Sequence, residues 1–253
     1  MISLKEKLQK GQLSIGSWIT IGNPSIAEIM AKTGFDWLAI DMEHSAITLS
    51  QAQYLIQIIE LSGVAPLVRV EENNPNIIKR VMDAGAHGVI VPMVNTKSEA
   101  LKAVSAVKYP PIGTRGVGLA RAQGYGLEFE KYKDWLSKES IVVVQIEHIS
   151  AVNNLADILS VKGVDGFIIG PYDLSASIGI PGEFKDKRLI KIMQEILNIA
   201  KRYNAVAGFH VIPPEFREVR KKIKEGYRFI GFSMDTLFLG KKCKIELNRA
   251  KGL

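Results

Sequence analysis

Short apolar stretches recur along the chain at the spacing expected of strands in an α/β protein. Each is rich in β-branched residues and is followed by a segment whose apolar positions repeat with helical spacing. The predicted strands are Ser14–Ile19, Trp37–Asp41, Pro66–Val70, Gly88–Val94, Val142–Glu147, Gly166–Gly170, Ala205–Val211 and Phe229–Asp235. The predicted helices are Ser25–Lys32, Ser50–Leu61, Pro75–Ala84, Lys97–Val107, Ile149–Ser160, Leu189–Tyr203, Pro214–Glu225 and Thr236–Ala250.

Eight strand–helix alternations in 253 residues are the pattern of a (β/α)8 TIM barrel. The alternative is a doubly wound open sheet. It is disfavoured because no GxGxxG turn follows the first predicted strand. No linker divides the chain, so we expect residues 1–253 to form a single (β/α)8 barrel domain.

One long insertion lies between the fourth and fifth predicted strands. Residues 109–140 include YPPIGTRGVGLARAQGYG, which is rich in glycine and arginine, and then an amphipathic helix from about Glu128. We expect the glycine-rich loop to lie at the functional end of the barrel as a lid, with Arg121 contacting an anionic substrate. The alternative is a disordered surface loop.

The fifth and sixth predicted strands form a strand–helix–strand unit with an acid after each strand. The helix returns the chain to the starting end, so the strands run parallel and Glu147 and Asp173 emerge at the same end. Two hard carboxylates at one mouth suit an ion such as Mg²⁺ or Mn²⁺ that keeps positions open for a substrate. The alternative is that both acids cap helices or form ion pairs.

Further chemistry follows the other predicted strands. In a barrel, catalysis is built at the carboxyl ends of the strands, and these ends carry Asp41, Glu43, His44, Arg69, Gln145, His210 and Asp235. An arginine adds positive charge where an enolate oxygen develops, and histidine is the side chain that most readily exchanges protons near neutral pH. We therefore assign Arg69 to the enolate and His44 to proton transfer, with Asp41 orienting the imidazole.

Structural alternatives remain for each of these residues. Asp41 is also suited to cap the following helix. Arg69 has Glu71 and Glu72 as possible ion-pair partners nearby in the sequence, and a lone histidine is more often a loop residue than a proton carrier. His210 is expected to form a wall of the site rather than to bind the metal.

Composition narrows the class of protein. The 47% hydrophobic and 23% charged residues suit a protein with a large core, and the single cysteine excludes an internal disulfide framework. The net charge of +7 is spread along predicted helices that also carry acids, so we expect no nucleic-acid partner. The chain has no apolar run of about 20 residues and its start lacks a secretory core, so we expect no membrane partner and a cytoplasmic protein.

Several motifs together resemble a known family. They are GFDWLAIDMEHSAIT, PLVRVEENNPNIIKRVMDAGAHGVIVPMV, KYPPIGTRGVG, VVVQIEHISAVNNL and GVDGFIIGPYDLSASIG. These motifs look like those of the metal-dependent class II pyruvate aldolases of the HpcH/HpaI family, which includes 4-hydroxy-2-oxoheptanedioate aldolase and 2-dehydro-3-deoxyglucarate aldolase. The resemblance runs from about Gly11 to Leu239.

The resemblance implies a reaction and a set of site residues. The reaction is the reversible cleavage of a 4-hydroxy-2-oxo acid to pyruvate and an aldehyde through an enolate stabilised by a divalent cation (Mg²⁺, Mn²⁺ or Co²⁺). The family's residues fall on Glu147 and Asp173 for the metal, on His44, Asp41 and Arg69 for catalysis, and on Gln145, Pro171, Tyr172 and Asp173 for the oxo acid. It further implies a homohexamer, a trimer of dimers, in which the last helix packs on a neighbouring subunit.

Two features depart from the family and leave the substrate open. The seventh strand reads AGFHVIPPE where the aldolases carry a smaller apolar run, so His210 places a bulky polar group near the pyruvate end of the site. The eighth strand has a bulkier start. Two alternatives stay open: a citrate-type carbon–carbon lyase or synthase that uses the same enolate, and a catalytically silent barrel that binds an oxo acid.

Overall fold

The strands close into a barrel in the order in which they occur in the chain. The computed structural model describes residues 2–252, and neighbouring strands pair in parallel all the way round the barrel. The strands are β1 (Ser14–Ile19), β2 (Trp37–Asp41), β3 (Ala65–Arg69), β4 (Gly88–Val91), β5 (Ile141–Ile146), β6 (Gly166–Ile169), β7 (Ala207–Val211) and β8 (Phe229–Met234). The predicted TIM barrel is confirmed.

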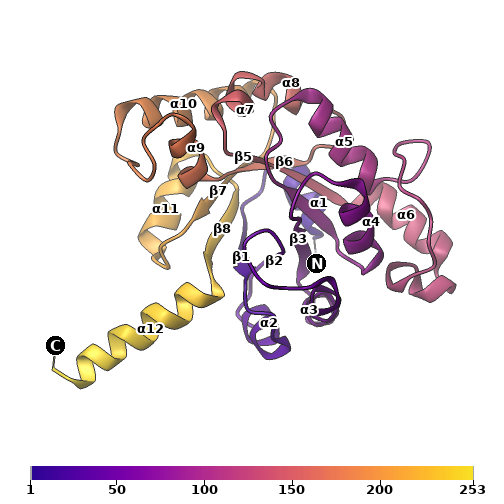
Figure 1. Ribbon diagram of the computed structural model, residues 1–253, viewed down its shortest axis with the longest axis horizontal. Helices are drawn as coiled ribbons and strands as arrows, with labels where there is room; N and C mark the ends of the chain where they lie inside the picture. The colour runs from indigo at the N-terminus through magenta and orange to yellow at the C-terminus, as the bar shows by residue number, and fades with distance from the viewer. Residues whose placement is uncertain (1, 253) are drawn as a thin grey trace.

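Helices surround the strands (Figure 1). They are α1 (Leu4–Gln9), α2 (Pro24–Ala31), α3 (Leu49–Leu61), α4 (Pro75–Asp83), α5 (Lys97–Val107), α6 (Phe129–Glu139), α7 (Ile149–Asn153), α8 (Leu155–Leu159), α9 (Pro171–Ser177), α10 (Lys187–Arg202), α11 (Phe216–Glu225) and α12 (Asp235–Ala250), with a 3₁₀ turn η1 (Arg121–Gly126). Capping boxes at Thr48 and Thr96 satisfy free amide groups at the starts of α3 and α5. The single helix predicted over residues 149–160 is instead two helices, α7 and α8. The break comes at Asn154, whose side-chain amide donates to the carbonyl of Asn95 at 2.8 Å.

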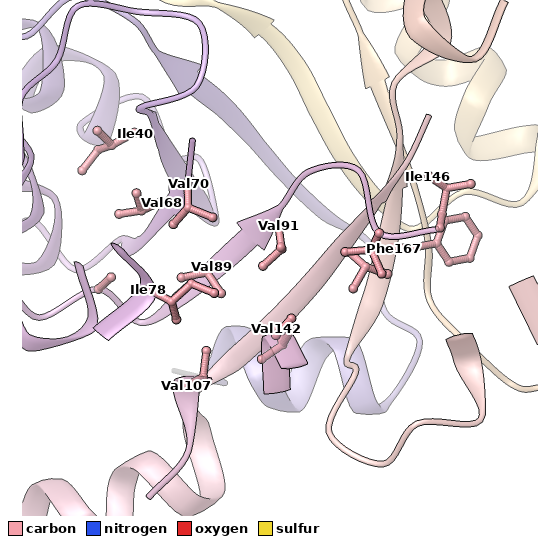
Figure 2. Packing of buried hydrophobic residues seen from close by; sticks show 14 of the residues in the cluster. Ile40, Val68, Val70, Ile78, Val89, Val91, Val107, Val142, Ile146 and Phe167 are labelled. Atoms are coloured by element: carbon pink, nitrogen blue, oxygen red, sulfur yellow. The ribbon is translucent and has the colours of Figure 1, made fainter. Parts of the chain in front are cut away.

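Alternate residues of each strand face the helices and form the outer core. Figure 2 shows Val68, Val89, Val91 and Val142 in the packing between strands and helices, and all four are fully buried. The residues between them face the inside of the barrel. Burial on both faces explains why the strand sequences read as continuous apolar runs rather than as an alternating pattern.

Large rings fill the barrel near the amino ends of the strands. Trp37 stacks on Phe229 with ring centroids 4.4 Å apart, and a Cβ added at Gly16 would lie 2.0 Å from the Trp37 ring. Gly16 therefore makes room for the indole. Above these rings lies a layer of small and branched residues from the even-numbered strands, namely Ala39, Ile90, Ile168 and Gly231.

The uppermost inward layer changes in character. It is contributed by the odd-numbered strands, as is usual for alternate layers in TIM barrels, and consists of Trp18, Arg69, Gln145 and His210, which line one cavity. Polar side chains thus replace apolar ones at the carboxyl ends of the strands.

The last helix starts against the barrel, where the ring of Phe238 meets that of Phe232 5.1 Å away, and then extends outward. α12 projects away from the barrel (Figure 1), and its Leu239, Ile245 and Leu247 are exposed. Across residues 2–252, none of the helices is both long and apolar enough to cross a bilayer.

Candidate active site

A cavity of about 210 Å³ opens at the carboxyl ends of the strands. Its walls contain most of the residues predicted from the sequence. Those that line it are Asp41, His44, Arg69, Gln145, Pro171, Tyr172, Asp173 and His210, together with Trp18, Thr20, Ile168, Ile169, Gly170, Ile212 and Met234.

Glu147 is held at the edge of this cavity by two amide groups. Its Oε1 accepts a hydrogen bond from the backbone N–H of Met93 at 2.7 Å, and its Oε2 accepts one from the side chain of Gln145. Met93 has a φ of 50°, an uncommon backbone conformation for a residue other than glycine. Burial raises the pKa of Glu147 and the nearby charge of Asp173 adds to this effect, while the two amides act against it.

Gly170 keeps the space beside Glu147 clear. A Cβ at this position would lie 3.0 Å from the Oε2 of Glu147 and 3.4 Å from the Nε2 of Gln145. The next residue, Pro171, begins α9, so Asp173 lies in the first turn of that helix and on the cavity wall. The two acids predicted to hold a metal therefore border the same site.

Arg69 is fixed by a bidentate contact with Asp41. Its Nε donates to Oδ1 at 2.9 Å and its Nη2 donates to Oδ2 at 2.6 Å. The guanidinium also lies over the Trp18 ring, 4.5 Å from its centroid. Burial alone would raise the pKa of Asp41, but the hydrogen bonds and charge of Arg69 hold that pKa below its ordinary value. Asp41 thus keeps its charge and positions the arginine.

The expected contact between Asp41 and the imidazole of His44 is absent, and that prediction is wrong. The carboxylate of Asp41 is engaged by Arg69 and by the backbone amides of Glu43 and His44, each 3.1 Å from Oδ1. The imidazole of His44 is exposed at the rim, and its Nε2 lies 3.7 Å from the Oε2 of Glu43. The carboxylate beside the histidine is therefore Glu43.

Glu43 received no role from the sequence, although it lies between two residues that did. Its Oε2 is 3.3 Å from the Nε of Arg69. Burial raises its pKa from 4.5 to about 7; the charge of Arg69 opposes this rise, and the charges of Glu147, Asp41 and Asp173 reinforce it. The second acid of the DMEH run was a usable signal, but its burial depends on packing that the sequence does not display.

The charges around the cavity favour a bound cation. Four carboxylates (Asp41, Glu43, Glu147 and Asp173) interact around the single guanidinium of Arg69. Within the described part of the chain, no three His, Cys, Asp or Glu side chains gather as a metal cluster. Two carboxylate ligands with the other positions left to substrate and water suit Mg²⁺ or Mn²⁺, so the residues present fit the predicted ion.

Arg121 lies at the opposite end of the barrel, and the predicted contact with substrate in the same barrel is wrong. Its Nη1 donates to the carbonyl of Ala84 at 3.1 Å and its Nη2 pairs with Glu60, near the start of β4. The 109–140 insertion follows α5 and precedes β5, so it connects a helix to a strand. Such connections lie at the amino ends of the strands, away from the catalytic face, and the loop is no lid over the cavity.

Two other predicted residues belong to the wall of the site, and a third supports the backbone of a wall residue, Thr20. His210 lines the cavity, and its ring lies 5.2 Å from that of Trp18. Tyr172 is half exposed and meets the ring of Phe184 edge-on at 4.8 Å. Asp235 is used for structure, because its carboxylate accepts hydrogen bonds from the backbone amides of Thr20 and Ile21 at 2.8 Å.

Comparisons with known proteins show the family of the chain. Residues 14–240 match the family described as HpcH/HpaI aldolase/citrate lyase. The chain is 36% identical over 235 residues to the 2-keto-3-deoxy-L-rhamnonate aldolase of Escherichia coli K12, covering 92% of this chain and 87% of that protein.

Solved structures agree in fold over nearly the whole chain. The HpcH/HpaI aldolase of Desulfitobacterium hafniense DCB-2 has a TM-score of 0.91 at 29% identity, covering 100% of this chain and 98% of that one. The citrate synthase SbnG has a TM-score of 0.88 at 26% identity, with coverage of 100% and 98%. The chain therefore belongs to the HpcH/HpaI aldolase/citrate lyase family and is an enzyme of the carbon–carbon lyase class.

Proposed function

We propose that the protein is a divalent-metal-dependent aldolase that reversibly cleaves a 4-hydroxy-2-oxo acid to pyruvate and an aldehyde. The observation that carries the proposal is a cavity lined by Asp173 and a bidentate Asp41–Arg69 pair, with Glu147 at its edge beside Gly170. In this proposal Glu147 and Asp173 would hold a cation next to a fixed positive group. A cation and an arginine placed in this way stabilise the negative charge that develops on an oxo acid during bond cleavage.

The cation completes the charge balance of the site. When held by Glu147 and Asp173, Mg²⁺, Mn²⁺ or Co²⁺ supplies a Lewis acid for the oxygen atoms of the 2-oxo acid. Gln145 and the backbone of Met93 orient Glu147 for this role. The surplus of carboxylates, expressed in the raised pKa of Glu43, supports a cation here.

Two protein residues carry out the other steps: one transfers a proton and the other stabilises negative charge. In the cleavage direction His44 takes the proton of the C4 hydroxyl, the C3–C4 bond breaks, and its electron pair moves toward the C2 oxygen. Arg69 stabilises the negative charge of the resulting enolate, because its fork is held in place before the reaction by Asp41. Protonation at C3 then yields pyruvate, and the former C4 leaves as an aldehyde.

A citrate-type reaction is the second candidate. The similarity to the citrate synthase SbnG supports it, since that structure matches the whole chain at 26% identity. The same cation and Arg69 would stabilise an enolate that attacks a different acceptor. The two candidates differ in substrate and not in the chemistry of the cation.

Release of pyruvate is the test of the proposal. The protein is stripped with EDTA, supplied with Mg²⁺, Mn²⁺ or Co²⁺ in turn, and mixed with a panel of 4-hydroxy-2-oxo acids while pyruvate is measured with lactate dehydrogenase. We expect release only after a metal is returned. Release of acetate or a thiol from citrate-like compounds would favour the second candidate, and failure of every 4-hydroxy-2-oxo acid in the panel would contradict the proposal.

The oligomer expected from the family remains part of the proposal. α12 projects from the barrel with Leu239, Ile245 and Leu247 exposed. Leu239 and Leu247 lie on one side of the helix without cover within their own chain, which suits packing on a neighbouring subunit. We therefore propose a homo-oligomer, a hexamer by family resemblance.

A further inference from the structure

His210 carries a hydrogen-bonding atom that no protein group uses. The residue lies on β7 and, with Trp18, Arg69 and Gln145, forms the polar layer at the floor of the cavity. Its Nε2 is buried and has no hydrogen-bond partner among residues 2–252. An enclosed ring nitrogen without a partner destabilises the free protein unless a ligand or solvent group meets it.

The other ring nitrogen of His210 is engaged by β8. The ring is hydrogen-bonded to the backbone of Ser233, and this contact raises the pKa of the imidazole. A contact with that effect is a ring N–H donating to a carbonyl oxygen, because donation favours the protonated form. The backbone takes an unusual course here, since Ser233 has a φ of 52° and the pairing of β8 with β1 shifts register beside it. Such bulges re-aim groups next to functional sites.

These contacts determine which hydrogen bond Nε2 is able to make. Burial and the charge of Arg69 lower the pKa of His210 to about 3, so the ring is neutral at physiological pH. A neutral imidazole has one N–H, and the Ser233 contact assigns it to Nδ1. Nε2 therefore presents a lone pair, and only a donor group satisfies it.

The neighbours of His210 narrow the identity of that donor. Arg69 lies close enough to lower the pKa of the ring by its charge, so an ammonium group would be repelled. A carboxylate has no hydrogen to donate. The side-chain hydroxyl of Thr20 is already bound to Asp235, and the indole nitrogen of Trp18 faces the position of Gly231 in the layer beneath, 3.0 Å from where a Cβ would be.

We infer that Nε2 of His210 accepts a hydrogen bond from a hydroxyl group of the substrate, which makes His210 the residue that selects a hydroxylated substrate over its deoxy analogue. The inference rests on the proposed function and refines it. It favours aldehydes with a hydroxyl next to the reacting carbon or oxo acids with a hydroxyl on the reacting carbon, and it disfavours substrates that present an apolar or carboxylate group to this wall.

The hydroxyl has two possible positions on the substrate, and two assay arms distinguish them. In the aldol direction with pyruvate as donor, lactaldehyde is compared with propanal, which tests a hydroxyl on the aldehyde. With propanal as acceptor, hydroxypyruvate is compared with pyruvate, which tests a hydroxyl on the oxo acid. The quantity measured is the ratio of kcat/KM for the hydroxylated compound to that for its deoxy partner.

Three variants separate recognition from folding and packing. We expect the wild-type ratio to favour the hydroxylated compound in one arm and His210→Leu to lower that ratio about 10- to 100-fold, since the hydroxyl then faces an apolar group. His210→Gln, whose carbonyl oxygen is an acceptor, should retain part of the preference. Met234→Leu changes an apolar wall residue of the same cavity and should leave the ratio unchanged.

The outcomes distinguish this inference from the proposed function. Turnover with equal ratios in wild type and His210→Leu would overturn the inference and leave the aldolase intact. If no variant turns over any aldehyde, calorimetry in the presence of Mg²⁺ replaces the assay and measures affinities for two pairs of ligands. The first pair is hydroxypyruvate and pyruvate, and the second is 5-hydroxy-2-oxohexanoate and 2-oxohexanoate. Neither 2-oxohexanoate compound has a C4 hydroxyl, so retro-aldol cleavage does not occur. Equal affinities within both pairs would overturn the inference there.

Discussion

Removing the charge of Glu43 should stabilise the metal-free protein, and more strongly as the pH rises. The structure raises the pKa of this carboxyl from 4.5 to about 7, mainly through burial. The folded protein therefore holds the proton more tightly than the unfolded chain does. The bound proton of Glu43 therefore contributes to the free energy of unfolding. This contribution is fully present below pH 4.5 and is lost as the pH rises through about 7, and the total loss is ~3 kcal/mol.

Glu43→Gln mimics the protonated carboxyl at every pH. We expect wild type and variant to unfold at similar urea concentrations at pH 4, and the variant to be more stable by ~3 kcal/mol at pH 8 when EDTA is present. Adding Mg²⁺ should narrow the gap, because a cation offsets the surplus negative charge. The exposed Glu130→Gln serves as the control and should show little dependence on pH.

A gap that stays constant between pH 4 and pH 8 would refute this reasoning. So would a wild type that gains stability over the variant as the pH rises, because Glu43 would then be stabilised in its charged form. In either case the carboxylates around Arg69 would not be in surplus, and the argument for a cation would lose its electrostatic support.

Three further changes test other parts of the account. Arg69→Lys should lower kcat for pyruvate release about 100-fold, because an ammonium cannot keep the two-point contact with Asp41; unchanged turnover would move the enolate role elsewhere. Gln145→Leu should weaken Mn²⁺ binding about 10-fold by releasing Glu147, which calorimetry measures, and an unaltered Kd would show that the amide does not orient the ligand. Replacing Leu239 and Leu247, which lie on one side of α12, by glutamate should reduce the mass found by light scattering if that helix packs on a neighbouring subunit, whereas a wild-type monomer would remove that role.

The order and type of the strands could be predicted because strands that are buried on both faces consist of continuous apolar runs. β1 and β2 were predicted with the bounds that the structure has. The break between α7 and α8 could not be predicted, since the apolar spacing continues across Asn154 and the break accompanies a contact with Asn95, far away in the chain. Local pattern carries no information about such a contact.

The site was predictable where chemistry follows directly from a strand end. Asp41, Arg69, Gln145 and Asp173 line the cavity because residues at the carboxyl ends of parallel strands share one face. Arg121 lies away from the cavity because a connection from a helix to a strand falls at the amino ends of the strands, whatever its glycine and arginine content.

The pairing of the charged groups was beyond the sequence. Asp41 faces Arg69 and not His44, and Glu43 is the carboxylate beside the imidazole. Which of several acids at one strand end turns inward depends on the course of the backbone after the strand, and the DMEH run gives no sign of it.

Binding of Mn²⁺ to the metal-free protein, followed by calorimetry, is the most direct measurement of the central claim. The account predicts one site per chain, with affinity reduced at least 100-fold in Glu147→Gln and in Asp173→Asn, because each change removes one of two carboxylate ligands. Wild-type affinity in either variant, or no binding to the unmodified protein in the presence of pyruvate, would contradict it.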